Sequence, residues 1–194
     1  MRKTILVTGS SHGIGAATVE AFSKDGYDVG INYCHSPNDA MEVAARCRAL
    51  GADAQVYRAD VSKREDCERM LNAFIDHFGH IDVLVNNAGG ALKMPKGGFV
   101  DMPMEYWDDQ IALNLSSAAY CSHVAAKNMI EECRSDSPWV AHGEHLTATC
   151  HTADYIATIP HGRTGFQYIS HVYVFLDILC NLPSVFVVFQ CNVK

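Results

Sequence analysis

A glycine-rich run near the start of the chain has the residue types and spacing of a turn that binds phosphate. The run is Thr8-Gly9-Ser10-Ser11-His12-Gly13-Ile14-Gly15. It follows the apolar residues Ile5-Leu6-Val7 and precedes an apolar-periodic stretch, which predicts a strand, a turn and a helix. Glycine lets the backbone approach a pyrophosphate closely, and the first N–H groups of the helix would face the phosphates. The run therefore predicts a nucleotide site, and an ordinary tight turn is the alternative.

The surrounding pattern alternates strands and helices over the first two thirds of the chain. The predicted strands cover residues 3–8, 27–33, 54–60 and 81–85, and the predicted helices cover residues 14–24, 38–50, 62–78 and 104–133. Ser62 and Glu65 form a predicted capping box at the start of the third helix. We therefore expect an α/β fold: a Rossmann-like, doubly wound parallel sheet with helices on both faces, whose C-terminal part is incomplete or irregular.

Four motifs, in this order and spacing, resemble the short-chain dehydrogenase/reductase family over residues 1 to about 133. They are the glycine run, Asp60-Val61, Asn86-Asn87-Ala88-Gly89 and Asn114. The resemblance implies NAD(P)-dependent reduction of a carbonyl or oxidation of an alcohol on a small molecule. The implied cofactor-binding residues are Gly9, Ser11, His12, Gly13, Ile14, Gly15, Tyr33, Asp60, Val61, Asn87, Ala88 and Gly89. We expect Gly13→Val to abolish nucleotide binding through a Cβ clash.

Asn114 lies on the apolar stripe of the predicted helix 104–133. A polar amide at such a position must be hydrogen-bonded or it costs stability. One interpretation is a core asparagine satisfied by backbone groups. The resemblance adds a second interpretation, in which Asn114 is the surviving member of the family's catalytic group.

The end of the second predicted strand bears on the choice of cofactor. A carboxylate there would bond the ribose 2′-OH and select NAD. The strand instead ends in Asn32-Tyr33-Cys34-His35, and His12 stands where many NADP-preferring relatives carry a base. The resemblance therefore favours NADP over NAD, with His12 as a solvated turn residue as the alternative.

The proton donor that the family uses is not found in this sequence. The resemblance requires a Tyr followed four residues later by a Lys, and Tyr155 is followed by Ile159. A phenol without a nearby cation keeps a pKa near ~10 and is a poor base at neutral pH. Ser135 and Ser137 lie before any plausible fifth strand, so neither is a convincing family serine. We expect little or no catalysis.

The composition changes after Cys133. Charged residues become sparse and histidines dense, so we divide the chain into an NAD(P)-binding domain, 1–133, and an atypical segment, 134–194, that replaces the usual substrate-binding part. Two origins of this segment are possible: an altered reading frame of a working reductase, and a divergent protein that binds nucleotide without turnover.

A function of another class is a metal site, for which the candidate ligands are Cys133, His142, His145, Cys150, His151 and His161.

The remaining features concern partners and location. The apolar run 172–189 approaches the length of a membrane span, but its Val and Phe content favours a strand, and we expect no membrane partner.

A net charge of −7 argues against nucleic acid as a binding partner. The eight cysteines show no Cys-x-x-Cys spacing and are interpreted as reduced thiols in a cytoplasmic protein. The family resemblance implies a homo-oligomer, although the late interface elements are not recognisable.

Overall fold

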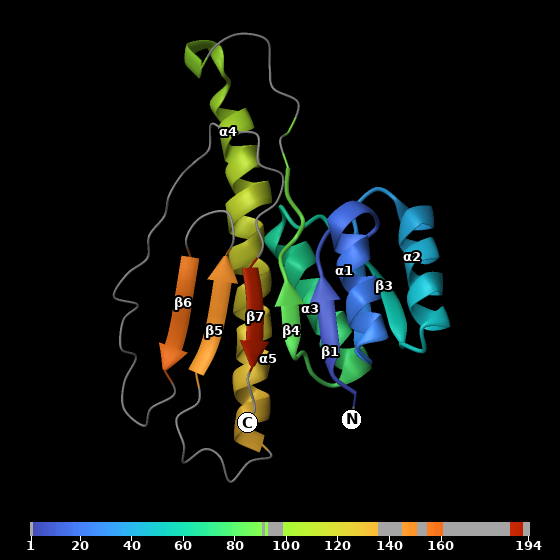
Figure 1. Ribbon diagram of the computed structural model, residues 1–194. Helices are drawn as coiled ribbons and strands as arrows, with labels where there is room; N and C mark the ends of the chain where they lie inside the picture. The colour runs from blue at the N-terminus through green and yellow to red at the C-terminus, as the bar shows by residue number, and fades with distance from the viewer. Residues whose placement is uncertain are drawn as a thin grey trace.

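A parallel four-stranded sheet forms the centre of the first half of the molecule (Figure 1). The computed structural model describes residues 2–90, 92, 99–135, 145–150, 155–160 and 187–191. The strands are β1 (Thr4–Val7), β2 (Asp28–Tyr33), β3 (Ala54–Arg58) and β4 (Val83–Val85), in the order β3-β2-β1-β4. Their carboxyl ends meet at one edge, where ligands bind in such sheets.

Helices cover both faces of this sheet, which confirms the predicted fold class. The core between one face and the helices α1 (Gly13–Lys24) and α2 (Pro37–Ala49) includes the fully buried Ile5 and Val19. The core on the other face lies under α3 (Arg64–Phe78) and α5 (Ser117–Ser135). Strands that are buried on both faces read as continuous apolar runs rather than alternating ones, as Ile5-Leu6-Val7 does.

The predicted capping box at α3 is wrong. The residue before the first helical turn is Lys63, and no side chain caps the helix. The Ser62 hydroxyl instead donates to Asp60 Oδ1 at 2.7 Å. Ser62 is thus engaged by the turn before the helix, and Glu65 falls in the first turn, where a negative charge favours the helix dipole.

The helix predicted over residues 104–133 is interrupted. It consists of α4 (Met104–Ile111), a π-helical turn (Ala112–Ser116) and α5, and a short 3-10 helix at Phe99–Asp101 precedes it. The predicted stripe is buried in α5 at Ala118, Cys121, Ala125 and Met129 but only partly buried in α4. A π-helical turn is rare, and such turns frequently occur at functional sites.

Three further strands extend the sheet beyond β4 with antiparallel pairing. They are β5 (His145–Cys150), β6 (Tyr155–Pro160) and β7 (Val187–Cys191), and the complete order is β3-β2-β1-β4-β7-β5-β6. The Val- and Phe-rich run therefore contributes a strand at its end, and the rest of that run lies outside the described residues. No helix in the described part of the chain has the length and apolarity to cross a membrane.

Candidate nucleotide-binding site

The glycine turn between β1 and α1 is held against the loop that follows β4. The Thr8 hydroxyl oxygen accepts from the backbone N–H groups of Asn87 at 3.0 Å and Ala88 at 2.9 Å. In return, the Asn87 amide Nδ2 donates to the carbonyl oxygens of Thr8 at 2.9 Å and Gly9 at 3.1 Å. Two predicted motifs that are almost eighty residues apart thus form one rigid unit.

Two glycines are required by this close packing. A Cβ at Gly9, which has φ +62°, would lie 2.9 Å from Ala88 Cα. A Cβ at Gly15 would lie 2.6 Å from Asn87 Nδ2 and 2.7 Å from the Gly9 carbonyl oxygen. Ala88 Cα and the Gly9 carbonyl oxygen are backbone atoms, and the Asn87 amide is held by two hydrogen bonds, so these contacts cannot relax cheaply.

Gly13 faces open space, because its Cβ would meet no protein atom within 4 Å. The expected clash of the Gly13→Val Cβ would therefore be with a bound nucleotide, and it stays a prediction. The φ of +58° at Gly13 makes a side chain strained, and the space around it is open to a ligand. The neighbours His12 and Ile14 are exposed, whereas Ser11 is buried.

The amino end of α1 leaves backbone donors for a phosphate. The first N–H groups of a helix have no intrahelical acceptor. His12 precedes the helix without a side-chain cap, and the first turn carries no acidic residue. The start of α1 is therefore chemically suited to an anion, beside the open space at Gly13.

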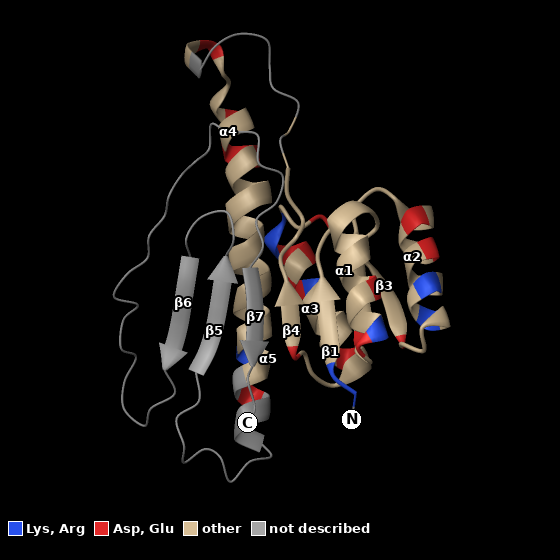
Figure 2. Ribbon diagram, in the orientation of Figure 1, with Lys and Arg blue, Asp and Glu red and all other residues tan. Residues whose placement is uncertain are grey.

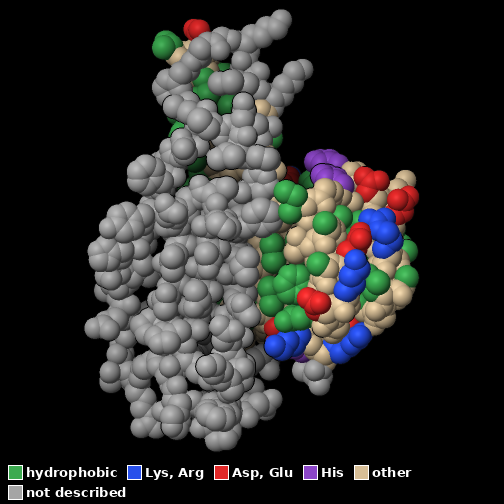
Figure 3. All heavy atoms as spheres, viewed as in Figure 1, with side chains coloured by type: hydrophobic (Ala, Val, Ile, Leu, Met, Phe, Trp, Pro, Cys, Tyr) green, Lys and Arg blue, Asp and Glu red, His purple; other side chains and the backbone are tan. Residues whose placement is uncertain are grey.

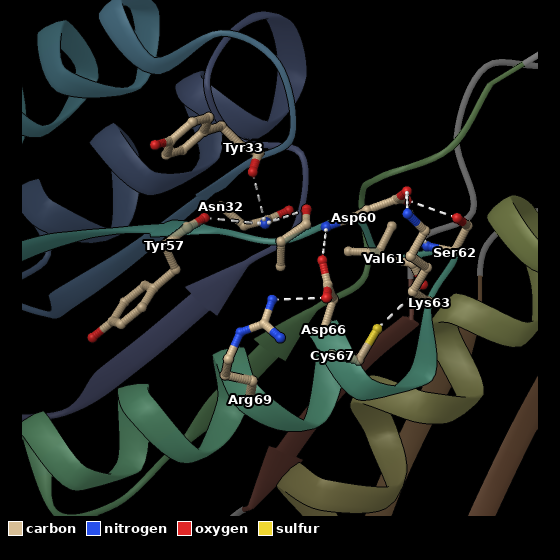
Figure 4. Close-up of polar contacts among 11 residues, drawn as sticks. Asn32, Tyr33, Tyr57, Asp60, Val61, Ser62, Lys63, Asp66, Cys67 and Arg69 are labelled. Carbon is tan, nitrogen blue, oxygen red and sulfur yellow. Dashed lines mark hydrogen bonds and ion pairs between the residues drawn. The ribbon is translucent and has the colours of Figure 1, made fainter.

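Asn32 and Ser10 are site-forming residues that the sequence motifs do not mark. The Asn32 side-chain oxygen accepts from the Gly9 N–H at 2.9 Å, and its amide nitrogen donates to the carbonyls of Tyr33, Tyr57 and Ala59 at 3.2–3.4 Å (Figure 4). The Ser10 hydroxyl donates to the Val7 carbonyl at 2.7 Å and accepts from the Asn32 N–H at 3.0 Å. The sequence does contain a signal for the role of Asn32. It is the one amide side chain in a largely buried and mostly apolar strand, where it needs hydrogen-bond partners.

Asp60 and Val61 lie at the carboxyl end of β3, next to Asn32 (Figure 4). The Asp60 carboxylate accepts from the Ser62 N–H and hydroxyl and lies 3.4 Å from the Lys63 ammonium. Partial burial raises the pKa of Asp60, but the hydrogen bonds from Ser62 and Lys63 outweigh it, and the net effect lowers the pKa. Tyr33, at the end of β2, is half-buried and pairs in register with Arg58.

Asn114 lies in the π-helical turn and holds the loop after β4. Its Oδ1 accepts from the Gly90 N–H at 2.8 Å, and its Nδ2 donates to the Gly90 carbonyl at 3.0 Å. Nδ2 also donates to the Gln110 carbonyl at 3.0 Å. The expectation that this amide is hydrogen-bonded is confirmed, and its partners are backbone groups. A role in catalysis stays a prediction.

Tyr155 does not lie beside the glycine turn. Tyr155 is the first residue of β6, and β7 and β5 separate that strand from β4. Three strand spacings put its backbone about 14 Å from β4. Ser135 ends α5, and Ser137 lies outside the described residues.

The metal alternative receives no support from the described residues, among which no three His, Cys, Asp or Glu side chains are grouped to hold an ion. His145 and Cys150 lie on β5, whereas His142, His151 and His161 fall outside the described ranges.

Comparison with known proteins agrees with this geometry. The family model for short chain dehydrogenases matches residues 3–136. The chain belongs to this family. L-rhamnose 1-dehydrogenase (NAD(P)(+)) of a Sphingomonas strain is 35% identical over 130 residues, which are 67% of this chain and 50% of that protein. A 3-oxoacyl-(acyl-carrier-protein) reductase of Staphylococcus epidermidis is 33% identical over 133 residues, which are 68% and 53% of the two chains.

Two solved structures show the same fold. The NADH-dependent reductase A1-R′ complexed with NAD superposes with a TM-score of 0.64 at 32% identity, over 69% of this chain and 55% of that one. Acetoin dehydrogenase of Salmonella typhimurium gives a TM-score of 0.63 at 32% identity, over 69% and 52%. This chain therefore spans about half the length of the relatives that it matches.

Proposed function

We propose that this chain binds NADP(H) at the glycine turn, as the nucleotide half of a short-chain oxidoreductase that acts on a carbonyl or alcohol of a small molecule. One observation carries the proposal: Thr8 and Asn87 hold the turn rigidly while Gly13 faces open space at the amino end of α1. A rigid cradle loses little entropy when it binds a phosphate. The similarity to L-rhamnose 1-dehydrogenase (NAD(P)(+)) and to a reductase solved in complex with NAD supports this cofactor class.

The preference for NADP(H) rests on the end of β2 and on His12. No carboxylate follows Tyr33 in the residues Cys34, His35 and Ser36, so nothing there repels a 2′-phosphate. His12 is exposed in the turn, where its ring can donate a hydrogen bond to a phosphate. Both features favour the phosphorylated cofactor.

We propose further that this chain turns substrate over far more slowly than a family member with a complete catalytic group. No tyrosine in the sequence has a lysine four residues later. Without such a cation, a phenol stays protonated at neutral pH and transfers its proton poorly. The described cysteines Cys34, Cys47, Cys67 and Cys121 are free thiols, which fits the cytoplasm as the proposed location.

The test is thermal unfolding of the chain with NADPH, NADP⁺, NADH and NAD⁺, followed by assays of NADPH oxidation with small aldehydes and ketones. A ligand at about 100 times its Kd stabilises a folded protein by about 2.7 kcal/mol. We expect the largest shift from NADPH and slow or unmeasurable turnover. A transition that no nucleotide moves would overturn the binding proposal, and turnover at rates ordinary for enzymes would overturn the catalytic one.

His12→Ala tests the cofactor preference, and His123→Ala, an exposed histidine on α5, is the matched control. We expect His12→Ala to reduce the shift with NADPH and to leave the shift with NADH unchanged. The control should reduce neither. Equal loss with both cofactors would assign His12 to the shared pyrophosphate rather than to the 2′-phosphate.

A further inference from the structure

A surface cavity of about 390 Å³ lies beside the glycine turn, between α1 and α2. His12 lines it from the turn, Glu20 from α1, and Asp39, Glu42 and Arg46 from α2. Figure 3 shows histidine and acidic side chains next to each other over the upper end of these helices. The cavity thus continues from the predicted phosphate site toward the first turns of α2.

The walls of this cavity carry more negative than positive charge. Arg46 is bonded to Glu20 at 2.8 Å, so these two groups largely neutralise each other. Asp39 and Glu42 are exposed, and neither forms an ion pair with any side chain that the structure describes. Two carboxylates of the cavity wall, Asp39 and Glu42, therefore remain beside the Arg46–Glu20 pair.

The negative charge of Asp39 and Glu42 lies close to the end of β2, where it can affect the choice between NADP(H) and NAD(H). In such sheets the adenosine ribose is held at the carboxyl end of β2, and α2 begins only four residues after β2 ends at Tyr33. A 2′-phosphate there would lie between the glycine turn and the first turns of α2. Asp39 and Glu42 belong to those turns, and they share the cavity with His12.

We propose that Asp39 and Glu42 are specificity residues of this site: they disfavour the 2′-phosphate, so the chain binds NADP(H) only modestly better than NAD(H) and accepts both. This inference rests on the proposed nucleotide function and qualifies its cofactor preference. His12 attracts the phosphate from one wall of the cavity, and the two carboxylates of α2 repel it from the other. A carboxylate within about one Debye length of a phosphate shifts its affinity by about three- to tenfold at ordinary salt.

If Asp39 only stabilised helix α2, its removal would have a different effect on cofactor binding. Asp39 lies in the first turn of α2 and Arg46 and Arg48 in the last, which is the charge arrangement that a helix dipole favours (Figure 2). If stabilising the helix were the only role of Asp39, its removal would lower stability and leave the relative affinities for NADPH and NADH unchanged. The ratio of the two affinities therefore separates the two roles.

The experiment measures Kd for NADPH and NADH by calorimetry on the full chain, Asp39→Asn, Glu42→Gln and the double variant. We expect NADPH to bind about tenfold or more tightly to the double variant than to the unmodified chain, with NADH affinity changed less than twofold. The gain should shrink in 0.5 M salt, because salt screens exposed charges. The matched control is Asp25→Asn with Asp76→Asn, which removes the same charge from exposed positions at the ends of α1 and α3.

The outcomes distinguish this inference from the function on which it rests. An unchanged ratio of affinities in a double variant that binds both cofactors would overturn the specificity role and leave the nucleotide site standing. An equal gain in the control pair would assign the effect to net charge and overturn the inference as well. Failure of the unmodified chain to bind either nucleotide would overturn the proposed function and the inference together.

Discussion

The two sides of β4 are built in different ways. On one side, β1, β2 and β3 are parallel, and side chains tie their ends together across the sequence: Asn32 reaches Gly9, and Asn87 reaches Thr8. On the other side, β7, β5 and β6 pair antiparallel through the backbone ladder. In the first arrangement, the side-chain contacts form a site at the ends of the strands.

β4 is where these two arrangements meet. Its residues Val83, Leu84 and Val85 pair with β1 on one side and with β7 on the other. Among the described residues, the loop after β4 bonds to the glycine turn, to Asn114 and to the side chains of Tyr106 and Ser122. We therefore expect damage on the β7 side to affect nucleotide binding less than damage on the β1 side.

Gly15→Val should have the largest effect. The new Cβ would lie within 2.8 Å of Asn87 Nδ2, the Gly9 carbonyl oxygen and Ser10 Cα, so the turn must move. Overpacking of this kind costs about 3 kcal/mol or more, and it displaces the backbone donors. We expect loss of the thermal shift with NADPH and a lower transition temperature.

Two controls sharpen this comparison. Gly51→Ala introduces strain at φ +90° but meets no atom within 4 Å, and we expect a cost of about 1 kcal/mol with nucleotide binding intact. Thr149→Pro in β5 removes a donor from a strand with a neighbour on each side, and it should also leave binding intact. If Thr149→Pro abolished binding, the proposed independence of the two sides would be wrong.

Asn32→Leu should be the next most damaging change. It removes the acceptor for the Gly9 N–H and the donor to three carbonyls, and the side chain is only 2% exposed. Unpaired buried polar groups cost about 1–3 kcal/mol each, and we expect a total of about 2–4 kcal/mol in chemical denaturation. Asn72→Leu, at an exposed position of α3, is the control and should cost under about 0.5 kcal/mol. An equal cost for both variants would contradict the assigned role of Asn32.

The sequence predicted the parallel half well because its signals are local. Apolar runs predicted β1 to β4, and the glycine spacing predicted the turn, within one or two residues of the observed bounds for most elements. It missed the contacts that cross the sheet, such as Asn32 with Gly9, because nothing local says which carbonyl a buried amide will meet. The sequence also predicted Ser62 as the N-cap of α3, which is wrong. The spacing of a capping box does not show that the Ser62 hydroxyl will bond to Asp60 instead.

Asn114→Leu should have a smaller effect, concentrated on the loop after β4. It removes two hydrogen bonds to Gly90, and we expect a cost of about 1–3 kcal/mol and faster amide exchange at Gly90. Asn128→Leu is a control, because Asn128 is a buried asparagine on the adjoining helix α5 and its Oδ1 accepts from the Ile81 N–H at 3.1 Å. Both variants should lose stability, but only Asn114→Leu should weaken NADPH binding. If Asn128→Leu weakened binding equally, the effect would come from the helix and not from the loop.

Asp60→Asn should have the smallest effect on stability, and the size of that effect depends on pH. The hydrogen bonds from Ser62 and Lys63 outweigh burial and lower the folded pKa of Asp60 below its ordinary value of 3.8. Ionised Asp60 therefore stabilises the fold above that pH, and the contribution is lost as pH falls through the lowered pKa. It amounts to under about 1 kcal/mol, because a third of the side chain is exposed and solvent screens its charge. Denaturant midpoints at pH 7 and pH 3 should show the unmodified chain more stable than the variant at pH 7, with a smaller difference at pH 3. A difference that grows on acidification would contradict the assigned hydrogen bonds.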